Sequence, residues 1–116
     1  MNKNIKNKWL KALRSGEYKQ GKSALRDGDT YCCLGVLTEL YRKETGLGIW
    51  EKGKIGMDFY NEEEISMGVP SKTICEWAGL NDENPSVESE HGICIAEIND
   101  KGVSFNEIAD IIEEQL

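Results

Sequence analysis

The sequence YCCLGVLTELYRKETG, residues 31–46, is the strongest helix signal in the chain, because its apolar residues recur at the spacing of one helix face. These positions are Cys33, Val36, Leu37, Leu40 and Tyr41. Asp29 or Thr30 can cap the start of such a helix, and Gly46 can end it. Gly35 lets another backbone segment approach closely, since glycine has no Cβ. We therefore predict that the central helix of the fold begins near residue 31.

Two more amphipathic helices are predicted toward the ends of the chain. Ile5, Trp9 and Leu13 share one face of a helix from about residue 4 to residue 15. Ser104 and Glu107 have the spacing of a capping box, and apolar residues at helical spacing follow them. These signals place helices on both sides of the central one.

The segments between these helices carry weaker signals. Residues 16–30 are rich in glycine and are predicted to form a loop or short extended pieces. Residues 47–69 suggest a small hairpin, with the acidic run 62–64 in a solvated loop, and residues 70–79 suggest a short helix. Residues 93–98 fit either a strand or a short helix. We expect one domain over residues 1–116, a mostly helical α+β fold with three amphipathic helices around a small sheet or irregular insert.

The charge of the chain is unevenly distributed. Residues 1–26 hold eight of the fourteen basic side chains and one acid, whereas the remaining residues have a net charge of −14. An acidic body repels long DNA, which argues against direct nucleic-acid binding and favours a small anion or a basic protein partner. The basic face of the first helix is expected to be solvated and attracted to an acidic neighbour. Its side chains are Lys3, Lys6, Lys8, Lys11 and Arg14.

Neither a membrane span nor an export signal is expected. The longest apolar run covers residues 31–37, well short of the ~20 residues that a membrane span needs. The first sixteen residues lack the apolar region of a signal peptide. These patterns predict an intracellular protein with reduced thiols. The adjacent Cys32 and Cys33 are first of all expected to be small core residues.

A papain-like thiol hydrolase is the sharpest enzyme hypothesis. Cys32 or Cys33 would be the nucleophile near a helix N-terminus, and Gln20 would be the oxyanion donor. His91 would act as the base and Asn99 would orient it. The core-like residues around the cysteines argue against this hypothesis, and the order of residues in a chain says nothing about their distance. It stays open as an alternative.

No cofactor or metal site is predicted. His91 and Cys94 have the spacing of a chelating pair, and Cys75 could add a ligand, but the second half of a zinc site is missing. The glycines lack the spacing and the flanking helix of a nucleotide-binding loop.

Several short blocks give the chain a family resemblance. The blocks are WLKALRSG (9–16), YKQG (18–21), YCCLGVL (31–37), EWAGL (76–80), NP (84–85) and the C-terminal segment from EIND at 97–100 through SF at 104–105 to IAD at 108–110. In this order and with these gaps, they resemble a family of small tailed-phage and prophage proteins. The resemblance covers nearly the whole chain and implies a phage accessory protein acting in the cytoplasm of a bacterial host. It supplies no catalytic residue.

Recognition of a ligand is the function that the residues favour. An aromatic ring, an amide and three cations lie within nine residues of the glycine-rich loop and suit a nucleotide-sized anion. These predicted ligand-binding residues are Tyr18, Lys19, Gln20, Lys22 and Arg26, with Trp9 or Tyr31 lining the pocket. We therefore expect a phage protein that binds without catalysis and counteracts host defence by sequestering a small nucleotide-like signal.

Three further readings of the surface stay open. In one, the acidic flank at Glu62–Glu64 or at Glu113 and Glu114 blocks a host protein. In another, the acidic body imitates nucleic acid and inhibits a host enzyme. The C-terminal helix, with Ile111, Ile112 and Leu116, could also hold a homo-oligomer together.

Overall fold

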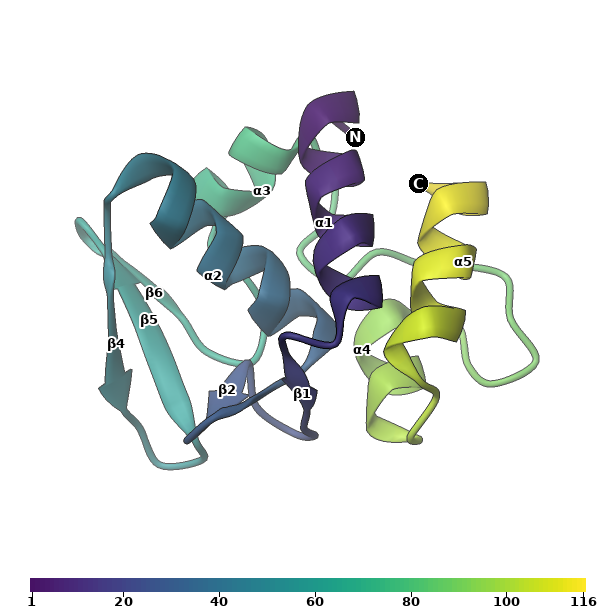
Figure 1. Cartoon of the computed structure of the whole chain (residues 1–116). Helices are drawn as coiled ribbons and strands as arrows, with labels where there is room; N and C mark the ends of the chain where they lie inside the picture. The colour runs from purple at the N-terminus through teal and green to yellow at the C-terminus, as the bar shows by residue number, and fades with distance from the viewer.

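The computed structural model describes residues 1–116 as five helices and a six-stranded mixed sheet (Figure 1). The helices are α1 (Lys3–Ser15), α2 (Cys33–Thr45), α3 (Lys72–Ala78), α4 (Ile95–Asp100) and α5 (Phe105–Gln115). The strands are β1 (Lys19–Gln20), β2 (Arg26–Asp27), β3 (Thr30–Tyr31), β4 (Ile49–Lys52), β5 (Met57–Asn61) and β6 (Glu64–Ser66). The predicted α+β class is confirmed, with two short helices in addition to the three amphipathic ones. None of the helices is both long and apolar enough to cross a membrane.

The first and last helices pack side by side and run in opposite directions (Figure 1). Arg14 at the end of α1 bridges to Asp110 at 2.7 Å and to Glu113 at 3.1 Å, both on α5. Lys6 donates from Nζ to the Glu113 carbonyl oxygen at 3.0 Å. The basic face of α1 therefore has the acidic neighbour that its charge predicts.

Helix α2 lies at the centre of the core. Leu34, Val36 and Leu37 are fully buried, as the apolar stripe predicts. Trp9 of α1 is also fully buried, and its Nε1 donates to the Cys33 carbonyl oxygen at 2.9 Å. This hydrogen bond fixes α1 against the first turn of α2.

The start of α2 differs from the prediction of an Asp29 or Thr30 cap. The N-cap is Cys32, whose Sγ accepts a hydrogen bond from the Gly35 N–H at 3.3 Å. Thr30 belongs to β3, and its hydroxyl donates to the Asp27 carbonyl oxygen. The cap prediction was wrong because residues 26–31 form a tight β2–β3 hairpin, so the helix begins two residues later.

The sheet is larger than the predicted hairpin. Its strand order is β1-β3-β2-β5-β4, and β6 pairs with β5 beside that path. Only β1 and β3 run parallel. The insert at 47–69 supplies the three antiparallel strands β4, β5 and β6, and the inward-facing Phe59 packs on Tyr41 of α2 and Ile74 of α3.

The hydrogen bonds confirm some of the local predictions and contradict one. Ser104 accepts from the Glu107 N–H at 3.2 Å and so caps α5 as predicted. Residues 95–100 form a helix, and Ser86 and Cys94 form only an isolated bridge. The prediction of a solvated loop at 62–64 was wrong for Glu64, which begins β6 and accepts hydrogen bonds from Asn61 and the Thr73 N–H.

Candidate functional site

The phenol of Tyr31 is the centre of the candidate site. Tyr31 ends β3, and only 9% of its surface is exposed. Its ring contacts Tyr18 and Trp50 edge-on, at centroid distances of 5.3 and 6.2 Å. The Tyr31 hydroxyl makes no hydrogen bond within the protein, and its oxygen is accessible to solvent. A phenol whose ring is packed and whose O–H is unpaired can donate to an external acceptor.

Two cations near Tyr31, Arg26 and Lys43, are held by different contacts. The Arg26 guanidinium lies over the rings of Tyr31 and Trp50, at 5.1 and 5.6 Å from their centroids. Lys43 donates from Nζ to the Tyr18 hydroxyl at 2.9 Å. We call this set the aromatic–cation cluster. Its residues are Tyr18, Arg26, Tyr31, Arg42, Lys43 and Trp50, with Glu39 beneath them.

Glu39 is the buried anion that fixes one side of the cluster. Its carboxylate accepts two hydrogen bonds from Arg42, at 2.7 and 2.8 Å, and one from Trp50 Nε1 at 3.0 Å. Burial alone would raise the pKa of Glu39, but the hydrogen bonds from Arg42 and Trp50 outweigh it and lower the pKa. The carboxylate therefore stays ionised and holds both side chains in place.

The burial of Tyr31 and the charges around it also change the pKa of its phenol. Burial raises the pKa of Tyr31, while the charge of Arg26 opposes that rise. The hydrogen bond to Tyr18 raises the pKa of Lys43. At neutral pH the phenol is therefore a neutral donor beside stable cations, which is the arrangement that an oxyanion requires.

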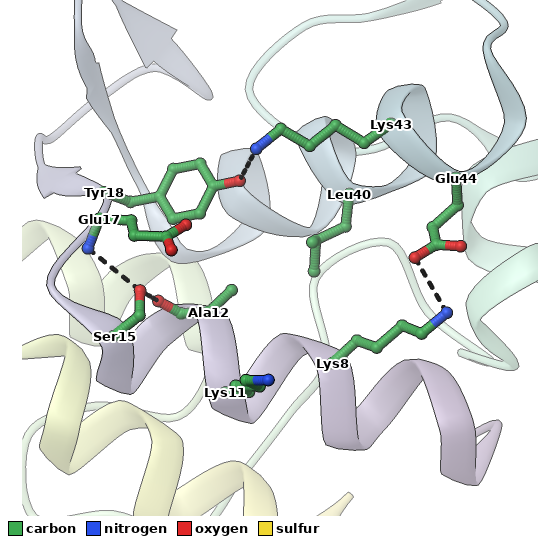
Figure 2. Close-up of a pocket in the computed structure, with 9 residues that line it drawn as sticks. All are labelled: Lys8, Lys11, Ala12, Ser15, Glu17, Tyr18, Leu40, Lys43 and Glu44. Atoms are coloured by element: carbon green, nitrogen blue, oxygen red, sulfur yellow. Dashed lines mark hydrogen bonds and ion pairs between the residues drawn. The ribbon is translucent and has the colours of Figure 1, made fainter.

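A groove between α1 and α2 adjoins the cluster, as Figure 2 shows. Its cavity volume is about 230 Å³, and Tyr18 and Lys43 form one of its ends. Lys8 bridges to Glu44 at 2.9 Å, whereas Lys11 has no ion-pair partner. Nine residues line the groove: Lys8, Lys11, Ala12, Ser15, Glu17, Tyr18, Leu40, Lys43 and Glu44.

Three of the predicted ligand residues, Tyr18, Arg26 and Tyr31, meet in this cluster. The other four lie outside it. Trp9 is fully buried, and Gln20 donates to the Asn99 Oδ1 and to the Val103 carbonyl oxygen. Lys19 and Lys22 are exposed.

Sequence reasoning missed four members of the site. Arg42 and Lys43 stand in the last turns of α2, where basic residues are common for helix-dipole reasons alone. Trp50 comes from the insert, whose register a sequence pattern does not supply. The i,i+3 spacing of Glu39 and Arg42 was the one available signal.

Only some of the residues named in the thiol hydrolase hypothesis lie close together. Asn99 Oδ1 accepts from the Cys33 N–H at 3.2 Å and from Gln20 at 3.0 Å, so these three form a buried structural node. His91 lies beside Glu90 and Glu107 instead, with Nε2 at 3.5 and 3.6 Å from their carboxylates. No hydrogen bond joins the imidazole to either sulfur.

Both thiols of the pair are also poorly suited to nucleophilic chemistry. Cys32 and Cys33 are buried, and Cys33 donates from Sγ to the Ile95 carbonyl oxygen at 3.8 Å. Burial raises the pKa of Cys32 to about 11 and raises that of Cys33 as well. The thiolate fraction at neutral pH is therefore small.

Comparison with known proteins gives a match at the level of the family. No curated protein and no solved structure matches the chain. The model of a family described as a domain of unknown function, DUF8296, matches residues 1–116. With its whole length covered by that match, this chain belongs to the DUF8296 family.

Proposed function

We propose that this protein binds a small nucleotide-like anion at the aromatic–cation cluster and releases it chemically unchanged. One observation carries the proposal. The Tyr31 hydroxyl is unpaired, and the cations around it are each held by a separate contact. Such a site is preorganised, so little side-chain entropy is lost when an anion binds.

The charge of the cluster selects an anion. The cluster holds three cations, Arg26, Arg42 and Lys43. Two carboxylates lie near them, that of Glu39 bound to Arg42 and that of Glu17 near Lys43, so the cluster is locally positive on a chain with a net charge of −7. Arginine presents a fork of donors that matches phosphate oxygens, and the phenol adds one more donor. A phosphate group therefore fits this donor set.

The rings and the groove favour a planar group attached to that phosphate. Tyr18 and Trp50 are half-buried, and Tyr18 and Leu40 line the groove beside the cations. Its volume of about 230 Å³ is below the ~300–1,000 Å³ of drug-sized pockets, which favours a mononucleotide over an oligonucleotide.

Binding without catalysis agrees with the burial and the raised pKa of the Cys32 and Cys33 thiols. A nucleophile needs an activated side chain with a base beside it, and the cluster contains no histidine and no cysteine. Cys32 caps α2 through its Sγ, and Cys33 donates from its Sγ to the Ile95 carbonyl oxygen.

The biological setting that we propose rests on the resemblance to phage and prophage proteins. In the cytoplasm of an infected bacterium, a small protein that sequesters a nucleotide signal would blunt a defence response. Expression of the chain in a bacterium with a nucleotide-signalled defence should restore plaque formation, and the Tyr31→Phe variant should not.

Thermal unfolding with a panel of cyclic and linear nucleotides tests binding directly. A nucleotide present at one hundred times its dissociation constant adds about 2.7 kcal/mol of stability. Tyr31→Phe removes only the unpaired hydroxyl and should weaken binding roughly 10-fold or more, since hydrogen bonds to charged groups are worth about 1.5–3 kcal/mol. Tyr60→Phe, on another strand, is the matched control and should bind as the wild type does. The proposal fails if no nucleotide shifts the unfolding temperature.

A further inference from the structure

The side chains of the aromatic–cation cluster offer more free hydrogen-bond donors than free acceptors. Both oxygens of the Glu39 carboxylate already accept hydrogen bonds, which come from Arg42 and Trp50. Arg26 donates from Nε to the Gly28 carbonyl oxygen at 2.8 Å, and both terminal nitrogens of its guanidinium are left without a partner in the protein. These free N–H groups can be satisfied only by water or by a ligand.

Two phenols add donors between two of the cations. Lys43 donates from Nζ to the Tyr18 hydroxyl oxygen at 2.9 Å, as Figure 2 shows, and no group in the protein accepts the hydroxyl proton of Tyr18 in turn. The Tyr31 hydroxyl is unpaired as well, and the two tyrosine rings meet edge-on at 5.3 Å. Arg26 lies 5.1 Å from the ring centroid of Tyr31, and Lys43 lies 5.2 Å from that of Tyr18. Two phenolic protons and two cationic groups are therefore available to one ligand.

The positive charge that remains unpaired suits a doubly charged anion. Arg42 binds Glu39 through two hydrogen bonds, so these two charges offset each other. Arg26 and Lys43 form no ion pair within the chain and lie instead against aromatic rings. Glu17 lies near Lys43, but its carboxylate accepts no hydrogen bond from the cluster. Two cations are therefore free to meet two negative charges.

Phosphate monoesters and phosphate diesters differ in charge and in the number of their terminal oxygens. A monoester has three terminal oxygens and, above its second pKa of about 6, two negative charges. A diester, such as the phosphate of a cyclic nucleotide, has two terminal oxygens and one charge that does not change near neutral pH. We infer that the aromatic–cation cluster binds the dianionic terminal phosphate of a linear nucleotide and discriminates against cyclic nucleotides. This inference rests on the proposed function and names the class of nucleotide that the site takes.

The phosphate of the ligand, and no group of the site, should titrate between about pH 5.5 and pH 7.5. Hydrogen bonds that outweigh burial lower the pKa of Glu39, and burial raises that of Tyr31, so both groups titrate further from neutral pH than usual. The one histidine of the chain, His91, lies beside Glu90 and Glu107 instead. Carboxylates ordinarily titrate near about pH 4, and phenols, lysines and arginines above about pH 10. The other charged side chains around the site, from the groove and from the side of β4 that carries Trp50, are all of these types: Lys8, Lys11, Glu17, Glu44 and Lys52.

Calorimetric titration of the full chain with a nucleoside 5′-monophosphate and with the 3′,5′-cyclic monophosphate of the same base tests this inference. The common ribonucleosides supply such pairs, and each pair is titrated at pH 7.5 and at pH 5.5. At pH 7.5 the linear nucleotide should bind at least ~10-fold more tightly, because the cyclic one lacks one charge and one acceptor oxygen. At pH 5.5 the linear nucleotide should bind about 4-fold more weakly, since a second pKa of about 6 leaves roughly a quarter of it doubly charged. The affinity for the cyclic nucleotide should be the same at both pH values.

The Tyr18→Phe variant tests whether the second phenol belongs to the phosphate site. It removes a free donor and keeps the ring, so the linear nucleotide should bind roughly 10-fold more weakly and the preference over the cyclic one should fall. Tyr60→Phe makes the same change on β5 and is the matched control, in which both affinities should equal those of the wild type.

A cyclic nucleotide that binds as tightly as its linear partner would overturn the inference and leave the proposed function standing. So would a linear nucleotide with the same affinity at both pH values, or a full preference for the linear form in Tyr18→Phe. If neither kind of nucleotide binds, the proposed function fails and the inference fails with it.

Discussion

At the scale of single residues, the closest constraint in the fold lies between α2 and Leu25, the residue before β2. A Cβ at Gly35 would overlap the Leu25 carbonyl oxygen, and that oxygen already accepts a hydrogen bond from the Cys32 N–H at 3.1 Å. The close approach predicted for Gly35 is therefore confirmed. It brings the β2 region against the first turn of the central helix.

We predict that Gly35→Ala destabilises the protein by about 3 kcal/mol. In an open helix the same change would stabilise by about 0.5–1 kcal/mol, so the overlap with Leu25 must reverse the usual sign. Urea unfolding of the two proteins measures the difference. A variant as stable as the wild type would show that α2 does not contact the backbone at residue 25.

The four cysteines should differ in reactivity. Burial raises the pKa of Cys32 and of Cys75 to about 11, and only Cys94 is partly exposed. Iodoacetamide at pH 8 should therefore label Cys94 first in the native protein and all four residues after denaturation. Mass spectrometry of the peptides reads the result. Rapid native labelling of Cys32 or Cys33 would revive the thiol hydrolase hypothesis.

At the scale of elements, the carboxylate of Glu39 joins α2 to β4 through Trp50. We predict that Glu39→Gln costs about 1–2 kcal/mol at pH 7, because charged hydrogen bonds to Arg42 and Trp50 become neutral ones. The folded pKa of Glu39 lies below its ordinary value of 4.5, so its contribution is complete above that value. The contribution is lost as the pH falls through the folded pKa.

The difference in unfolding free energy between wild type and Glu39→Gln should therefore shrink as the pH falls below 4.5. Chemical unfolding over a pH series measures it. Glu76→Gln is the control, because its ion pair with Lys72 is long, at 3.9 Å, and exposed. A difference for Glu39→Gln that stays constant with pH would mean that the carboxylate is not held ionised by its partners.

The sequence predicted the helices better than the sheet, because the spacing of a helix is visible within one segment whereas strand pairing joins distant segments. Apolar spacing in α1, α2 and α5 is local, so Trp9, Leu37 and Ile112 could be assigned to the core side of their helices. Strands β1, β2 and β3 have two residues each, which is too short for a visible alternation. Their pairing depends on contacts between distant segments.

The residues of the candidate site could be predicted only in part, for the same reason. Tyr18, Arg26 and Tyr31 belong to one glycine-rich segment, so their types and spacing in the chain indicated recognition of an anion. Trp50 and Arg42 join them only through the register of β4 and the pitch of α2. On α5, Ile112 is buried in the core, whereas Ile111 and Leu116 are partly exposed, and a homo-oligomer through this helix stays a prediction.

At the scale of the whole molecule, the uneven charge of the sequence is partly neutralised by the fold. Arg14 pairs with α5, and Lys8 pairs with Glu44 at the end of α2. The cations left facing outward beside aromatic rings are those of the aromatic–cation cluster. Of the basic residues in 1–26, Arg26 belongs to this cluster, and Lys8 and Lys11 line the neighbouring groove.

Binding of an unchanged nucleotide is measured by calorimetric titration of the nucleotide with the largest thermal shift, followed by mass analysis of the ligand recovered after denaturation. We expect saturable binding of one nucleotide per chain. We also expect binding weakened roughly 10-fold or more by Tyr31→Phe and recovery of the ligand with an unchanged mass. Binding that is indifferent to Tyr31→Phe, or a ligand recovered in cleaved form, would contradict the proposed function.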